Sequence, residues 1–233
     1  MVVVGTALIF FASQFAAVII VVIALVIAGK SESQVQDVLS ESNLHQLLIV
    51  FLVGVFLVWT VQYVLHKLKL PARQLLLLRN KPTLQTIGEV IVVYGVYFVT
   101  TVIVSTLLQS HTAINVEQSQ ELGITTPEDL PQKIIIFVML VVLPPIYEEI
   151  MFRGFLYQML RKYVPIAVSA VLTCILFGVA HLEYGNLNWI AAIDTLIFSA
   201  YLIYISQRHK SLYSAILLHA MKNAVAFSVL FVW

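Results

Sequence analysis

Two adjacent glutamates lie inside an apolar stretch of the chain, where ionisable residues are costly unless they are paired or hydrated. The sequence runs Pro144-Pro145-Ile146-Tyr147-Glu148-Glu149, and Arg153 follows four residues later. In an α-helix Glu149 and Arg153 are one turn apart and can pair, whereas Glu148 points about 100° away from Glu149. This arginine therefore cannot neutralise both carboxylates equally well, and one of them is left for other work. A buried structural ion pair between Glu149 and Arg153 is an equally open interpretation.

The two prolines before the glutamates predict a change in the helix. Proline has no N–H donor and disfavours helix at the residue before it, so we expect a kink or a fresh helix start just upstream of Glu148. A helix N-terminus at that point favours ionised carboxylates.

Two histidines follow in later apolar stretches, each with a partner four residues away. Phe177 and His181 share one face of a helix, and so do His219 and Asn223. Structural roles are open for both pairs, His181 as an interface residue at a span end and His219 with Asn223 as a hydrogen-bonded helix-packing pair. In lipid, however, such polar groups must find one another or water.

These residue types suit the attack of water on a carbonyl group. A carboxylate and a histidine can together deprotonate water, and a second histidine and an amide can donate hydrogen bonds to the developing oxyanion. The sequence lacks a nucleophile-elbow serine, a cysteine paired with these groups and a His-Glu-x-x-His motif. Two histidines and a glutamate can still ligate zinc by composition, so a metal stays open at this point.

The elements that position these residues are predicted to be membrane helices. Of 233 residues 61% are hydrophobic and only 11% are charged, whereas soluble domains carry about 25% charged residues. The net charge of +1 gives no electrostatic case for a nucleic-acid partner. A bilayer core needs about 20 apolar residues per helix. The sequence predicts an all-α polytopic bundle of about seven spans, with an eighth interfacial or half-inserted helix left open: residues 1–29, 42–66, 90–116, 134–160, 163–182, 184–207 and 211–233.

The loops between these spans alternate in charge. Basic loops face the cytoplasm, which places three loops and the N-terminus inside: Lys67 to Lys81, Arg161 to Lys162 and Arg208 to Lys210. Mainly acidic segments then lie outside, at Lys30 to Glu41, at Glu117, Glu121, Glu128 and Asp129, and at the short connection with Glu183. The segment Leu70 to Arg79 is predicted to lie in the cytoplasmic interface or to form a loop.

A single membrane domain, 1–233, is expected, with N-terminal spans and loops in 1–131 and the catalytic helices in 132–233. If the charged residues mark the ends of the spans, His181 lies roughly 25 Å above the cytoplasmic end of its span and His219 about 12 Å above the end of its own. The two imidazoles meet only if the spans end elsewhere or the helices are tilted. Asp194 and Lys222 are predicted to form a structural ion pair between the last two spans.

The three motifs resemble those of the CAAX protease and bacteriocin-processing membrane proteins, which include the type II CAAX prenyl endopeptidases. The family pattern is Glu-Glu-x-x-x-Arg, then Phe-x-x-x-His, then His-x-x-x-Asn, on successive membrane helices. In this chain the same order is found in Glu148-Glu149 to Arg153, Phe177 to His181 and His219 to Asn223. The resemblance covers about residues 144–227, and it departs from the family at Asp194, at Phe198-Ser199-Ala200 and at Lys222.

The resemblance implies an intramembrane glutamate protease without a required metal or cofactor. By motif position, Glu148 activates water with His181, and His219 and Asn223 stabilise the oxyanion. The supporting residues are Glu149, Arg153 and Phe177. The implied partners are membrane lipid and a peptide, a lipidated protein or a peptide precursor as substrate, in a bacterial cell membrane. The oligomeric state is not predicted.

Two other classes of function stay open. Members of the family also act as bacteriocin self-immunity proteins or membrane regulators, which need no catalysis. A small transporter or channel would use the ionisable residues to line a path. It ranks third because the sequence has no internal repeat of the kind common in transporters.

Overall fold

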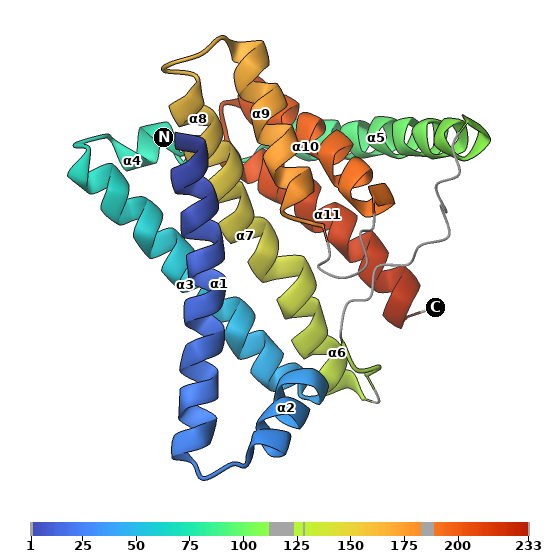
Figure 1. The fold of residues 1–233 in the computed structure, drawn as a ribbon. Coiled ribbons are helices and arrows are strands. Elements are labelled where there is room, and N and C mark those ends of the chain that lie inside the picture. Colours follow the sequence, from blue (N-terminus) through green and yellow to red (C-terminus); the bar gives the residue numbers. More distant parts are fainter. Residues whose placement is uncertain (1, 112–123, 128, 183–188, 233) are drawn as a thin grey trace. The chain divides into compact units, whose positions relative to one another are not determined.

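The computed structural model describes residues 2–111, 124–127, 129–182 and 189–232, and every regular element within them is a helix (Figure 1). This confirms the predicted all-α membrane bundle. In chain order the elements, with η for a π-helical segment, are α1 (Val2–Ile27), α2 (Glu32–Glu41), α3 (Asn43–Lys67), α4 (Ala72–Leu75), α5 (Leu84–His111), α6 (Leu130–Phe137), η1 (Val138–Val142), α7 (Leu143–Glu149), η2 (Ile150–Leu156), α8 (Tyr157–Leu160), α9 (Ile166–Val179), α10 (Trp189–His209) and α11 (Leu212–Phe231).

Six helical runs among the described residues are long and apolar enough to cross a membrane. They match six of the seven predicted spans. The seventh, predicted at 163–182, is the shorter helix α9 of 14 residues. At 1.5 Å per residue α9 is about 21 Å long, less than a bilayer core of about 30 Å. It starts late because Pro165 has the extended backbone of a helix-preceding residue, with φ −54° and ψ 153°.

The chain divides into two compact units, each built from separate parts of the sequence. Unit 1 comprises Met1–Ala72, Leu122–Met151 and Ala220–Trp233, and unit 2 comprises Arg73–Glu121 and Phe152–His219. Both units therefore draw on the predicted N-terminal and catalytic parts of the chain. The single domain 1–233 remains a prediction.

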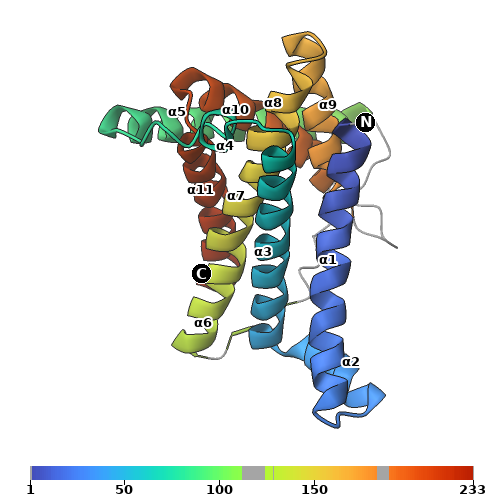
Figure 2. The same ribbon diagram turned by 90° about the vertical axis from the view of Figure 1, so that its left-hand side faces the viewer.

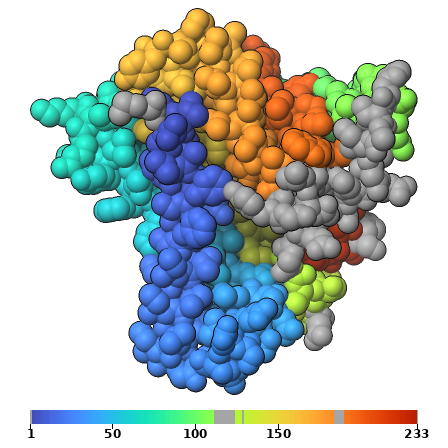
Figure 3. All heavy atoms as spheres, in the orientation of Figure 1, coloured from blue at the N-terminus to red at the C-terminus, as the bar shows by residue number. Residues whose placement is uncertain are grey.

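In unit 1, helix α3 lies between α1 and the run α6–η1–α7 (Figure 2). Every fourth residue of α3 from Val53 to Leu65 is buried, which makes one stripe along the helix. The space-filling view shows α1 in front of this unit (Figure 3). At the other side of the run, Phe227 of α11 packs against Ile136, Met139 and Val141.

In unit 2, helix α10 packs against both α5 and α9 (Figure 1). Small polar residues at its buried positions, Ser199 and Ser206, are fully enclosed. Small residues at a helix interface let the backbones approach closely, and such contacts, rather than a hydrophobic driving force, hold helices together in lipid.

The helical run from Leu130 to Leu160 changes its hydrogen-bond pattern on both sides of the glutamates. Segment η1 ends just before Pro144 and Pro145, which occupy the first turn of α7, a position where proline is tolerated. Of the predicted kink or fresh helix start upstream of Glu148, the structure shows a change of helix type, because the run stays helical through both prolines. Segment η2 begins directly after Glu149, so the assumption of an unbroken α-helix from Glu149 to Arg153 was wrong.

Loops that were predicted to share one side of the membrane are joined by hydrogen bonds. In unit 2, Leu212 N–H donates to Leu77 O at 3.0 Å and Asn80 Nδ2 donates to Lys210 O at 3.2 Å. These bonds join two of the basic loops. In unit 1, Thr125 Oγ1 donates to Glu41 O at 3.2 Å, which joins two acidic ones. Four acidic residues of the topology prediction lie outside the described residues: Glu117, Glu121, Glu128 and Glu183.

Gly178 allows the close approach of α9 to α10. A Cβ atom at this position would lie 2.8 Å from the carbonyl oxygen of Ala192 and 3.1 Å from Leu196 Cβ. Because a backbone oxygen cannot move aside easily, Gly178→Ala should destabilise the protein by about 1–3 kcal/mol through overpacking. The measurement is the unfolding midpoint in detergent.

The matched controls for Gly178→Ala are Gly88→Ala and Gly95→Ala on α5, where an added Cβ meets nothing within 4 Å. Alanine is the better helix former, so these variants should be neutral or up to about 1 kcal/mol more stable. A Gly178→Ala midpoint equal to those of the controls would contradict the close contact.

Candidate active site

The end of α9 fixes the orientation and the tautomer of His181. The last carbonyls of a helix lack intrahelical donors. In α9 the carbonyls of Leu176 and Gly178 accept hydrogen bonds from the backbone N–H groups of Ala180 and His181. The carbonyl of Phe177 instead lies 2.7 Å from His181 Nδ1. Because a carbonyl oxygen only accepts, Nδ1 carries the proton. In the neutral ring Nε2 is then the acceptor.

The Phe177 ring brings the two predicted histidines together within unit 2. Its centroid lies 4.6 Å from that of His181 and 6.0 Å from that of His219. Phe177 and His219 are buried, and His181 is half-buried. The difference in depth that the sequence indicated is therefore absent. By residue count His181 still lies 15 residues after the start of α9 at Ile166, and His219 lies seven after the start of α11 at Leu212. The two rings therefore meet because the helices do not run parallel from a common level.

Arg153 also contacts the Phe177 ring. Its Cζ is 4.0 Å from the Phe177 centroid, a close cation–π distance. Nη2 donates to Ser199 Oγ on α10 at 2.8 Å. The whole side chain is buried, with 0% exposure. The sequence indicated Glu149 alone as a partner for this arginine, so Ser199 was missed.

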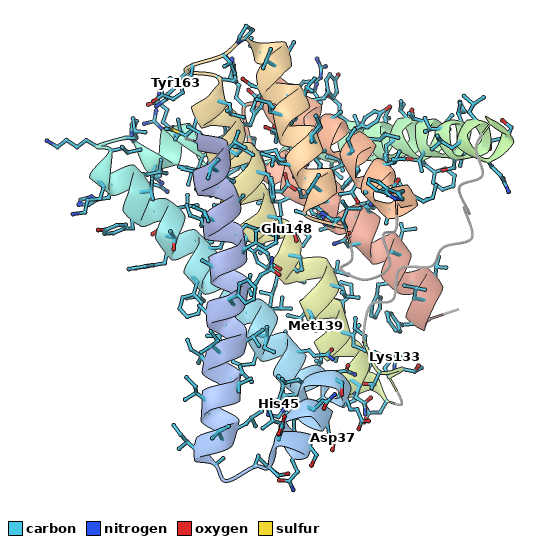
Figure 4. All side chains as sticks on the ribbon, in the orientation of Figure 1. Asp37, His45, Lys133, Met139, Glu148 and Tyr163 are labelled. Atoms are coloured by element: carbon cyan, nitrogen blue, oxygen red, sulfur yellow. The ribbon has the colours of Figure 1, made fainter. Side chains whose placement is uncertain are left out.

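The two glutamates end α7 in unit 1. Glu148 is 9% exposed and Glu149 is 0% exposed, and Figure 4 shows Glu148 on the same helical run as Met139. A groove of about 360 Å³ lies beside this turn, and its apolar walls come from α3 and α7. The groove is lined by Val50, Phe51, Gly54, Val55, Val58, Trp59, Gln62, Leu143, Ile146 and Tyr147.

Asn223 bonds to a carbonyl that the helix cannot satisfy. The carbonyl of Leu140 would accept from residue 144 in an α-helix and from residue 145 in a π-helix, but both are prolines without an N–H. Asn223 Nδ2 donates to Leu140 O at 2.9 Å. An unsatisfied carbonyl inside a membrane costs several kcal/mol, so Asn223 compensates for Pro144 and Pro145. The amide carries a second N–H for another acceptor.

Asp194 is held by α5 in unit 2. Tyr97 Oη donates to its Oδ1 at 2.6 Å, and Thr101 Oγ1 donates to the same atom at 3.0 Å. Sequence reasoning missed both donors, although their spacing of four residues in an apolar span was a signal. Lys222 belongs to unit 1, so its predicted ion pair with Asp194 stays a prediction.

Each unit thus gathers one part of the predicted site. Unit 2 holds Arg153, Phe177, His181 and His219 around one ring, and unit 1 holds Glu148, Glu149 and Asn223. The joint action of the carboxylates with the imidazoles stays a prediction. Within the described residues no group of three His, Cys, Asp or Glu side chains is placed to hold a metal ion.

Helices long enough to cross a membrane, with ionisable side chains buried inside them, define a polytopic integral membrane protein. Residues 130–225 match the family model described as type II CAAX prenyl endopeptidase Rce1-like. This segment is therefore similar to the type II CAAX prenyl endopeptidases, and it contains all seven predicted site residues. The resemblance inferred from the three motifs is confirmed. Comparisons with curated proteins and with solved structures found no match.

The bond from Asn223 to Leu140 can be tested with a double-mutant cycle. Asn223→Ala leaves the Leu140 carbonyl without a donor and should destabilise the protein by about 1–3 kcal/mol. In a Pro144→Ala background the new N–H of residue 144 can donate to that carbonyl, so the same substitution should cost clearly less. Unfolding in detergent measures all four proteins. An equal cost of Asn223→Ala in both backgrounds would show that the amide does not replace the proline donor.

Proposed function

We propose that the protein is an intramembrane endopeptidase in which Glu148 and His181 activate water for attack on a peptide bond. The observation that carries the proposal is the hydrogen bond from His181 Nδ1 to the Phe177 carbonyl. With its proton on Nδ1, the neutral ring presents Nε2 as the atom that takes a proton from water. A carboxylate beside the imidazole then stabilises the charge that develops.

In the proposed reaction the water oxygen bonds to the carbonyl carbon while its proton passes to the Glu148–His181 pair. The carbonyl oxygen becomes an oxyanion, to which His219 and the second N–H of Asn223 donate. The C–N bond then breaks, and the proton held by the pair passes to the leaving amine. Since Leu140 O already orients the Asn223 amide, little reorganisation is needed during the reaction.

The supporting residues hold this arrangement rather than react. The Phe177 ring, which is 1% exposed, contacts both imidazoles and the Arg153 guanidinium. We assign Arg153 and Glu149 the task of orienting Glu148. Both are fully buried, and a buried charge persists only where it is paired and hydrogen-bonded.

The apolar groove beside α7 supports a lipidated or otherwise membrane-associated peptide as the substrate. Its lining comes from α3 and α7 and includes Tyr147, the residue before Glu148. We propose that the hydrocarbon part of the substrate lies there. The basic loops joined by Asn80 and Leu77 support a cytoplasmic N-terminus.

Substitution of the proposed base should remove activity without loss of the fold. Glu148→Gln keeps the shape of the side chain but cannot accept a proton, so cleavage should fall by at least about 100-fold. Cells that express equal amounts of wild type and variant are compared by mass spectrometry of peptide and protein termini in membrane and secreted fractions. A precursor should accumulate, and its product should vanish, only with Glu148→Gln.

The matched control is Glu41→Gln, because Glu41 is an exposed carboxylate at the end of α2. It should leave the termini unchanged, and both variants should unfold at the wild-type midpoint. If termini and rescue of a deletion strain are the same for Glu148→Gln as for wild type, the protein acts by binding as a regulator or immunity protein.

The absence of a metal requirement is tested separately. In the proposed mechanism side chains carry out every proton transfer, and no metal ion takes part. Incubation of purified protein with a chelator should therefore leave cleavage of the identified substrate unchanged. Loss of activity that zinc restores would overturn the mechanism and favour zinc-activated water.

A further inference from the structure

A basic cavity lies in unit 2, apart from the residues of the proposed reaction. It has a volume of about 310 Å³ and is lined by Arg73, Leu78, Arg79, Lys81 and Tyr213. The three cationic side chains are exposed, and among the described residues none of them has an ion pair or a hydrogen bond. The cavity therefore concentrates positive charge that the described protein does not neutralise.

The segment that carries the lining residues Leu78, Arg79 and Lys81 is held to the connection between α10 and α11 by hydrogen bonds. Asn80 Nδ2 donates to His209 O at 3.3 Å and to Lys210 O at 3.2 Å, and Ser211 Oγ donates to Asn80 O at 2.5 Å. Leu77, whose carbonyl accepts from Leu212 N–H, has a left-handed φ of 53°. Such a backbone conformation persists only where the surroundings hold it.

Glu89, a carboxylate near the start of α5, already has cationic partners. Glu89 on α5 lies 2.6 Å from Arg208 Nε and 3.1 Å from His209 Nε2. Glu89 is therefore paired with residues at the end of α10. The charge of Arg73, Arg79 and Lys81 is left for a ligand from outside the described chain.

The location of the cavity indicates what that ligand is. It lies where α5 begins at Leu84, α10 ends at His209 and α11 begins at Leu212, and all three helices are candidate membrane spans. Helix ends of spans lie at the depth of lipid headgroups. Tyr213 is an amphipathic aromatic residue of the kind enriched at that depth.

We propose that this cavity binds the phosphate group of an anionic phospholipid. Two guanidinium groups and an ammonium group offer charge-assisted hydrogen bonds to phosphate oxygens, which arginine can make in a bidentate manner. Basic pockets between membrane helices are known to take such headgroups. Leu78 supplies an apolar wall for the glycerol end of the acyl chains. This site is independent of the proposed peptidase reaction.

Native mass spectrometry of purified, delipidated full-length protein tests the proposal. The probe is phosphatidylglycerol, with phosphatidylcholine of the same chains as the neutral comparison. The pocket variant Arg73→Gln/Arg79→Gln/Lys81→Gln should bind phosphatidylglycerol at least about tenfold more weakly than wild type. Its affinity for phosphatidylcholine and its unfolding midpoint should not change, because the substituted side chains are exposed.

The matched control Lys30→Gln/Lys69→Gln/Lys162→Gln removes the same charge from exposed residues outside the cavity. It should bind phosphatidylglycerol as wild type does. Equal weakening in both variants would show attraction by net charge alone, and no weakening in the pocket variant would show that the cavity is not the site. If millimolar inorganic phosphate alone stabilises wild type and displaces the lipid, the ligand is a soluble phosphate and the lipid proposal is overturned.

Discussion

A backbone carbonyl without a donor is costly inside a bilayer, and two residues of the predicted site donate to such carbonyls. His181 donates to the last-turn carbonyl of Phe177, and Asn223 donates to the carbonyl of Leu140 that two prolines leave without a donor. Each bond fixes a side chain through a backbone group that must be satisfied. The groups proposed for the chemistry are thus oriented by bonds that also satisfy the backbone.

The Phe177 ring is the second constraint, since one aromatic side chain contacts two imidazoles and a guanidinium. On the same helix, Gly178 lets α9 approach α10 closely. The small Ser199 on α10 then meets Arg153. Small residues at this interface therefore do more than pack helices. Ser199 also holds the guanidinium that lies 4.0 Å from the centre of the ring.

Residue type and spacing predicted much of this structure. The absence of charge over about 20 residues predicted the long helices. The spacing of four residues predicted that Phe177 and His181 lie on the same side, and their rings are in contact. The partners of Arg153 and Asp194 were not predictable, because Ser199, Tyr97 and Thr101 are polar residues of ordinary type whose contacts depend on helix packing. The π-helical segments were missed for a related reason. Prolines predict a disturbance but do not determine which hydrogen-bond ring replaces the lost one.

The π-helical segment η1 has a consequence for how the glutamates are aimed. A π-helical turn amounts to an α-helix with one residue inserted, and one residue corresponds to about 100° of rotation. Segment η1 separates α6 from α7, so it sets the azimuth of α7 around the helix axis independently of α6. Deletion of one residue from η1 would swing α6 around that axis relative to Glu148 and Glu149. The number of residues in this segment, more than the identity of any one of them, determines where the two carboxylates point.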